Sequence, residues 1–179
     1  YGAHDPSAVL LKDGKIIVGA EEERFTRIKH AYGQFPVNAI KFCLDFAGIT
    51  LKDIDYVACP FEERSQTWRK TIPYLIRNAR YQKAVGEAFF HELYIFMTGK
   101  IQRDLRTKFR QNFQEMPEVK YIPHDTSHLA SAYYASPFNG RDAMLMDIEG
   151  RAEIASTTFA SAENGSFQKI SQINVPDSL

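Results

Sequence analysis

The sequence predicts an α/β fold, and three observations support that prediction. A strand–turn–strand pattern opens the chain, an amphipathic helix follows it, and a short apolar strand comes next. A strand that follows a helix is typical of a crossover connection into a parallel sheet. A further run of three strands closes the chain and repeats the opening pattern, which indicates two related halves.

A tight turn between two apolar segments predicts the opening strands. Residues 7–12 alternate weakly, Asp13-Gly14 is a favoured two-residue hairpin turn, and residues 15–20 form the returning strand. Residues 1–4 have the character of the end of another strand, so we expect a three-stranded antiparallel meander. Because the chain starts without a methionine, we also expect it to be a piece of a longer protein.

An amphipathic helix is predicted over residues 37–47. Pro36 suits the first turn of a helix, and Gly48 suits the position just after its end. The apolar residues recur at helical spacing: they are Val37, Ile40, Cys43, Leu44 and Ala47. Residues 54–59 then form a short strand that Pro60 ends.

The middle of the chain, residues 62–113, predicts two or three helices with breaks at Pro73 and Gly99. Its basic residues are interspersed with acidic ones, which is typical of a solvated helical face rather than a nucleic-acid surface. The formal net charge of +0 agrees, so we expect no nucleic-acid partner. No apolar run has the length of a membrane span, and we expect no membrane association.

Only two cysteines are present, Cys43 and Cys59, and they do not form a CxxC motif. This excludes a disulfide framework and a zinc knuckle. We therefore expect two small core residues in a reduced, cytoplasmic protein.

The last third of the chain predicts one more strand–helix unit and then a meander. A strand is expected at residues 119–122 and a helix from there to about 135. Three strands follow, at residues 143–149, 153–160 and 167–175. Asn164-Gly165 is the predicted hairpin turn between the last two.

His124 and His128 are the most informative pair of residues. They are four positions apart at the start of the predicted helix, so both imidazoles leave the same face. Asp147 and Glu149 end the next strand, and residues two apart on a strand share a face. Two imidazoles with a carboxylate suit a first-row divalent metal and leave a position open for substrate. A chance histidine pair that only caps and packs is the alternative.

Several segments resemble one family. They are residues 2–8 (GAHDPSA), 20–30 (AEEERFTRIKH), 128–138 (HLASAYYASPF) and 149–153 (EGRAE). In this order they resemble the O-carbamoyltransferases that modify nodulation factors and antibiotics. The resemblance covers both ends of the chain, and residues 62–113 carry little of it.

The resemblance implies an actin-like ATPase fold of the ribonuclease H type, related to the tRNA threonylcarbamoyl-transfer ATPases. On this basis we expect residues 1–138 to form a first subdomain with a helical insertion at about 62–113. Residues 139–179 would open a second, truncated subdomain. The resemblance also implies ATP, carbamoyl phosphate, a carbamoyl-adenylate intermediate, iron(II), and a further domain beyond residue 179 that makes the adenylate. The acceptor would be a hydroxylated small molecule or sugar.

The chain departs from the family pattern at two places. Where the family has His-His-x-x-His, the inner position is Asp125. Where the family has Asp-Gly-x-Gly-Glu, the chain has Glu149-Gly150, with Asp147 two residues upstream. Counting from residues 136–138 favours Asp147 as the metal-binding carboxylate, and matching the glycine favours Glu149, so both stay candidates.

The resemblance also implies roles for residues outside the histidine pair. His4 and Lys29 are the candidate catalytic residues, both toward the anionic donor, because an imidazole and a flexible ammonium suit phosphate or carbonyl oxygen. Glu149 and Gly150 join them as candidate cofactor-binding residues. An actin-like ATPase or sugar kinase with carboxylate-bound magnesium, or a non-catalytic domain of the same fold, remains an alternative.

Overall fold

The computed structural model describes residues 4–61, 100–152, 154–174 and 177. Its contacts divide the chain into two compact units. The first unit is Tyr1–Val57 with Ile101–Glu118, and the second is Ala58–Lys100 with Val119–Leu179. Helices and small sheets occur in both, so the predicted α/β class is confirmed. Each unit is described by itself.

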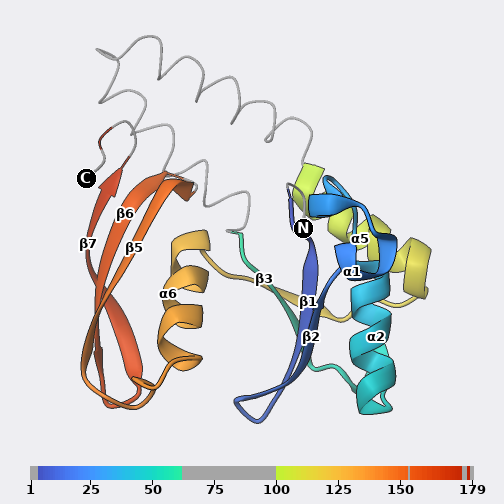
Figure 1. Ribbon diagram of the computed structural model, residues 1–179, viewed down its shortest axis with the longest axis horizontal. Helices are drawn as coiled ribbons and strands as arrows, with labels where there is room; N and C mark the ends of the chain where they lie inside the picture. Colours follow the sequence, from blue (N-terminus) through green and yellow to red (C-terminus); the bar gives the residue numbers. More distant parts are fainter. Residues whose placement is uncertain (1–3, 62–99, 153, 175–176, 178–179) are drawn as a thin grey trace. The chain divides into compact units, whose positions relative to one another are not determined.

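The first unit begins with an antiparallel hairpin of β1 (Ser7–Lys12) and β2 (Lys15–Glu21) (Figure 1). Asp13 and Gly14 have φ angles of 51° and 73°, the paired left-handed conformation that matches the twist of such a hairpin. The predicted turn is therefore confirmed. Residues 1–3, which would complete the expected third strand, lie outside the described residues.

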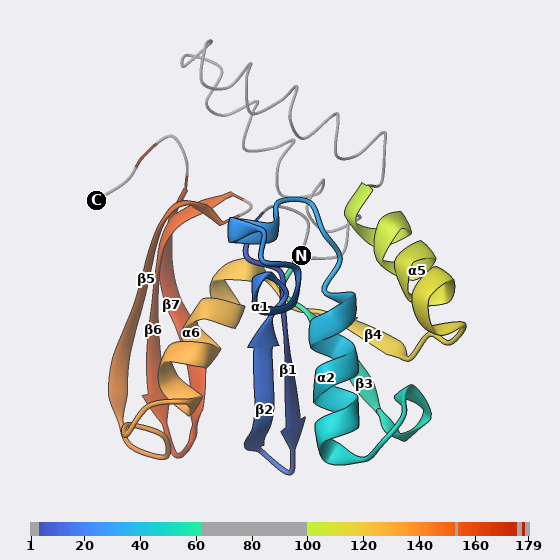
Figure 2. The same cartoon turned by 45° about the vertical axis from the view of Figure 1, so that its right-hand side comes forward.

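Helix α2 (Val37–Ala47) packs against both strands of the hairpin (Figure 2). It buries Ala39 and Cys43 on its inner side. Gly48 has a φ of 65° and donates its N–H to the Asp45 carbonyl, while the Ile49 N–H reaches the Leu44 carbonyl. These two bonds satisfy carbonyls that the last helical turn leaves free, so the predicted helix end is confirmed.

A short connection separates β2 from α2, and it contains α1 (Glu23–Thr26) and the 3-10 turn η1 (Lys29–Ala31). Its most buried polar residue is Glu22, which is 2% exposed. The Glu22 carboxylate accepts bonds from the Asn38 side-chain amide at 2.6 Å and from the Ala39 backbone N–H at 2.9 Å. A carboxylate there satisfies free N–H groups at the start of α2 and complements the helix dipole.

Replacing Glu22 with alanine is expected to lower the free energy of unfolding by about 2–3 kcal/mol, because a charged acceptor of buried N–H groups is lost. Glu21→Ala is the matched control, since Glu21 only forms an exposed pair with Arg24 at 2.9 Å. That control should change the stability by less than about 0.5 kcal/mol. Urea unfolding measures both, and equal losses would contradict the capping role.

Helix α5 (Lys100–Phe113) also belongs to the first unit, apart from its first residue. It buries Leu105 and Phe109, and the Phe109 ring meets that of Phe35 edge-on at 5.2 Å. The prediction of helix is therefore confirmed for residues 100–113, the end of the predicted insertion. The remainder, residues 62–99, lies outside the described residues.

The boundary between the two units falls within two short strands, β3 (Tyr56–Cys59) and β4 (Glu118–Tyr121). They pair with each other, and among the described residues β3 has no hydrogen-bonded place beside β1 or β2. The expected crossover of this strand into a parallel sheet therefore stays a prediction, and the partner that the structure gives β3 is β4. A crossover pattern brings a strand back into a layer, but it does not determine which neighbour supplies the backbone partners.

The second unit contains the three-stranded antiparallel sheet β5-β6-β7 and helix α6 (His124–Tyr134). The strands are β5 (Ala143–Ala152), β6 (Ala155–Glu163) and β7 (Ser166–Asn174). Asn164 and Gly165 have φ angles of 52° and 79° in the turn before β7, as predicted. Figure 1 shows α6 along one face of this sheet.

The side of α6 that packs on the sheet buries Leu129 and Tyr133. The Tyr133 ring also meets Phe167 of β7 edge-on at 6.3 Å. On β5, Met144, Met146 and Ile148 are exposed, which places the alternate residues on the face toward the helix. Asp147 and Glu149 belong to this alternate set, so they share a face as the i,i+2 spacing predicted.

The predicted boundary near residue 138 does not coincide with this division, because α6 belongs with β5–β7. Its apolar face is buried against that sheet, and burial determines where contacts cluster. The described part of the opening meander is the β1–β2 hairpin, because residues 1–3 lie outside the described residues. Two ribonuclease H-type subdomains therefore remain a prediction. Within the described residues, no helix has the length and apolar character needed to cross a membrane.

Candidate metal centre

The first turns of α6 bring the two histidines together. The Nε2 atoms of His124 and His128 are 3.2 Å apart, and the rings meet edge-on at a centroid distance of 4.8 Å. The helix begins directly after Pro123, so both residues lie in its first two turns. The predicted common face of the histidine pair is confirmed.

Glu149 of β5 supplies a carboxylate to the same point. Its two oxygens lie 2.6 Å from the His128 Nε2 and 3.7 Å from the His124 Nε2. One donor atom from each of the three residues lies within 4.8 Å of the donor atoms of the other two. The Glu149 side chain is 19% exposed, so the carboxylate is held largely out of bulk water.

The Glu149 Oε1 atom is buried and has no hydrogen-bond partner among the described residues, although it lies close to His128. In a tetrahedral site, donors held at about 2.0–2.2 Å from one metal ion are separated from one another by about 3.3–3.6 Å. The two Nε2 atoms are 3.2 Å apart, close to that range, and the two Glu149 oxygens lie 2.6 Å and 3.7 Å from them, on either side of it. Two imidazoles and one carboxylate are also the donor set of open, first-row divalent metal sites. The residues present therefore fit such an ion.

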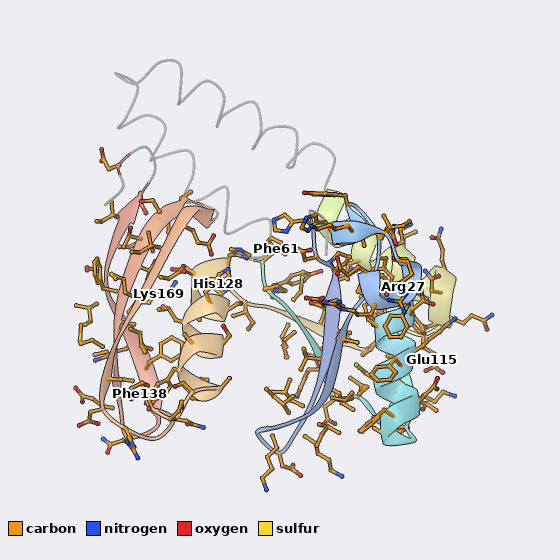
Figure 3. The ribbon with its side chains drawn as sticks, in the orientation of Figure 1. Arg27, Phe61, Glu115, His128, Phe138 and Lys169 are labelled. Carbon is orange, nitrogen blue, oxygen red and sulfur yellow. The ribbon has the colours of Figure 1, made fainter. Side chains whose placement is uncertain are left out.

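Two residues that directly follow β3, Pro60 and Phe61, hold the His124 ring in place. Its Nδ1 lies 2.8 Å from the Pro60 carbonyl oxygen, and Phe61 stacks on it with an interplanar angle of 15°. A carbonyl only accepts, so Nδ1 carries the hydrogen and Nε2 is left as a lone-pair donor. Such a contact orients a metal-binding histidine. Figure 3 labels Phe61 and His128.

Asp147 lies on the same face of β5, but its carboxylate does not join the group of converging donor atoms. Burial raises the pKa of Asp147, and the nearby Glu149 carboxylate raises it further. Of the two candidate carboxylates, the geometry brings Glu149 to the histidines and leaves Asp147 beside them.

Asp125, which replaces the inner histidine of the family pattern, points away from the histidine pair and into the sheet. It is 4% exposed and accepts bonds from Lys169 Nζ at 2.6 Å and from the Thr158 hydroxyl at 2.9 Å. Burial raises its pKa, but the bonds from Lys169 and Thr158 outweigh this and the net pKa lies below its usual value. Figure 3 labels Lys169 on the sheet.

This buried network ties α6 to β6 and β7. Asp125 immediately follows His124, so the tether fixes the rotation of the first helical turn. The sequence did not predict Lys169 or Phe61 as part of the site. Both partners are far from the histidines along the chain, and neither belongs to a recognisable motif.

Two of the other candidate residues, His4 and Lys29, lie in the first unit. Lys29 begins η1 and is exposed. His4 is exposed as well, and its Nδ1 contacts the Asp5 carboxylate at 2.7 Å. Gly150 follows Glu149 within β5 of the second unit. The metal donors thus belong to the second unit, and His4 and Lys29 belong to the first.

Comparison with known proteins decides the family. The model of the carbamoyltransferase N-terminus matches residues 1–179. The chain belongs to this family. This carbamoyltransferase N-terminal chain is 32% identical over 182 residues to an uncharacterized protein of Synechocystis sp., covering 98% of the chain and 28% of the relative.

Two further relatives agree. The nodulation protein NolNO of Sinorhizobium fredii is 26% identical, over 98% of the chain and 24% of that protein. An uncharacterized protein of Methanocaldococcus jannaschii is 25% identical, over 84% of the chain and 30% of that protein. The carbamoyltransferase N-terminal chain thus spans less than a third of the length of each of these relatives.

Proposed function

We propose that the chain is the N-terminal part of an ATP-dependent O-carbamoyltransferase, and that His124, His128 and Glu149 bind a divalent metal at its transfer site. One observation carries the proposal: three donor atoms converge within 4.8 Å in a chain of the carbamoyltransferase N-terminus family. The proposed donor is carbamoyl phosphate, activated with ATP to carbamoyl-adenylate. The proposed acceptor is a hydroxyl group of a small molecule or sugar.

Transfer from a carbamoyl-adenylate to an alcohol is an acyl-type reaction. The alcohol is a weak nucleophile, and charge develops on the carbonyl oxygen, so both need help from the protein. A divalent ion at this site would polarise the carbonyl or lower the pKa of the hydroxyl. His124 and His128 would offer Nε2 lone pairs to that ion, and Glu149 would partly neutralise its charge.

His4 and Lys29 complete the proposed machinery in the first unit. Lys29 is an exposed point charge suited to phosphate or carbonyl oxygen. His4 presents an imidazole from the connection before β1, where it can exchange a proton or a hydrogen bond with the donor. We further propose that both units belong to an actin-like fold of the ribonuclease H type, and that a separate domain of the whole protein forms the carbamoyl-adenylate.

The test uses the full-length protein and separates two reactions. Pyrophosphate release from ATP, dependent on carbamoyl phosphate, reports adenylate formation and needs no acceptor. Carbamoylation of a panel of hydroxylated small molecules and sugars, followed by mass spectrometry, reports transfer. Absence of carbamoyl-phosphate-dependent pyrophosphate release in the folded, metal-loaded protein would overturn the proposal.

Metal binding distinguishes the remaining classes of protein. A sugar kinase or actin-like ATPase of this fold would hold magnesium with carboxylates and would not need the histidine pair. A non-catalytic domain would bind no ion at His124 and His128. Equilibrium titration with cobalt(II), whose absorption reports imidazole ligation, is expected to show one site that requires both histidines.

A further inference from the structure

The Asp5 side chain contacts two histidines from different parts of the first unit. Its Oδ2 lies 2.7 Å from the His4 Nδ1, and its Oδ1 lies 2.9 Å from the His30 Nδ1. One carboxylate therefore bridges the segment before β1 and the η1 turn. His30 is the immediate neighbour of Lys29, so the bridge links the surroundings of both candidate catalytic residues.

The backbone reinforces this bridge. The Asp5 N–H donates to the His30 carbonyl at 2.9 Å, and the His30 N–H donates to the Glu23 carboxylate at 2.9 Å. Asp5 and His30 have φ angles of 50° and 61°, a left-handed conformation that is uncommon outside glycine. Such backbone persists where surrounding contacts hold it in place.

The bridge determines which nitrogen of each ring carries the hydrogen. An ionised carboxylate only accepts, so both Nδ1 atoms donate, and in the neutral form of each ring Nε2 is the nitrogen with the lone pair. The bonds from His30 and then His4 hold the pKa of Asp5 below its usual value, which keeps the carboxylate ionised. The outward nitrogen of His4 is thereby prepared to accept a proton or a hydrogen bond.

We propose that Asp5 is a positioning residue that orients the His4 imidazole with its Nε2 lone pair outward and fixes the turn carrying Lys29. This inference rests on the proposed function, which assigns His4 and Lys29 to carbamoyl transfer. Neither the family resemblance nor the donor-atom convergence at Glu149 assigns a role to Asp5. Its partners do, because both hydrogen-bonded nitrogens belong to functional segments.

The first test reads the ring nitrogens directly and does not need activity. Nitrogen NMR of the full-length protein with labelled histidine reports the tautomer of each ring, and His4→Gln and His30→Gln assign the two signals. In the unmodified protein both rings should carry hydrogen on Nδ1. In Asp5→Asn a single amide oxygen faces two donors, so at least one ring should change its tautomer.

Asp13→Asn is the matched control, because Asp13 is also an exposed aspartate with a positive φ of 51°. Asparagine tolerates that conformation, so neither substitution strains the backbone. The control should leave both rings unchanged. Hydrogen on Nε2 of His4 in the unmodified protein, or identical spectra for Asp5→Asn and Asp13→Asn, would overturn the proposal.

The second test follows kinetics. Asp5→Asn should lower the kcat of transfer by about 10- to 100-fold, the range for losing the outer partner of a functional histidine. KM and adenylate formation should stay within about twofold, which a general loss of structure would not produce. If the unmodified protein transfers no carbamoyl group, the proposed function fails while the ring spectra still decide the role of Asp5. A kcat equal to that of Asp13→Asn would overturn the positioning role.

Discussion

Replacing His128 with alanine is expected to lower carbamoyl transfer by the full-length protein by about 10²- to 10³-fold while leaving carbamoyl-adenylate formation unchanged. The His128 Nε2 lies 2.6 Å from Glu149 and 3.2 Å from the His124 Nε2, so its loss opens the donor group. Losing one preorganised electrostatic contact to a developing oxyanion has an effect of this size. Pyrophosphate release and product carbamoylation, measured in parallel, separate the two steps.

Three further variants extend this test. His124→Ala should match His128→Ala, and the double variant should be little worse, because ligands of one ion act as a unit. Ser131→Ala, an exposed position on the same helix, is the control and should bind cobalt(II) normally. Parallel loss of both activities in a folded His128→Ala protein, or survival of transfer, would contradict the assigned role.

Replacing Lys169 with methionine is expected to lower the free energy of unfolding by about 2–4 kcal/mol. The substitution leaves the Asp125 carboxylate, 4% exposed, without its charged partner. Removing one member of a fully buried pair costs about 3–5 kcal/mol, and the Lys169 side chain is 33% exposed, which reduces that figure. Urea unfolding of the variant and the parent measures the difference.

The double variant Asp125→Asn/Lys169→Met provides the control. It removes both charges while Thr158 retains a partner, so it should recover at least half of the loss. A Lys169→Met protein as stable as its parent would show that the ion pair contributes nothing. Cobalt(II) affinity of the single variant should also fall, because the tether holds the helical turn that carries His124.

Acid should remove the contribution of this pair. The folded-state pKa of Asp125 lies below the ordinary value of an aspartate, so the carboxylate stabilises the fold fully above about pH 4. That stabilisation is lost as the pH falls through the lowered folded-state pKa. The stability difference between the parent and Lys169→Met should therefore be largest near neutral pH, on the order of kcal/mol, and should shrink as the solution is acidified. A difference that grows in acid would contradict this assignment.

Local chemistry made much of the fold predictable from the sequence. Two turns, Asp13-Gly14 and Asn164-Gly165, adopt the paired left-handed conformation expected of them. Helix α2 occupies residues 37–47 as its apolar spacing and Gly48 predicted. These features depend on a few neighbouring residues, so their prediction needs no knowledge of distant contacts.

The choice of sheet partners was less accessible. The spacing that predicted β3 was sufficient for a strand, but the partner of β3 is β4, about sixty residues later in the chain. Likewise, α6 clusters with β5–β7, which follow it, rather than with the opening hairpin of β1 and β2. Partner choice depends on which apolar faces are buried together, and many pairings are compatible with one pattern of residues.

The candidate site shows the same separation. The sequence alone determined that His124 and His128 share a helix face and that Asp147 and Glu149 share a strand face, because helical and strand periods are local properties. Only the tertiary structure decided that Glu149 meets the histidines, that Lys169 holds Asp125, and that Asp5 bridges His4 and His30. Those contacts depend on packing between elements, and packing depends on the shape of every buried side chain between them.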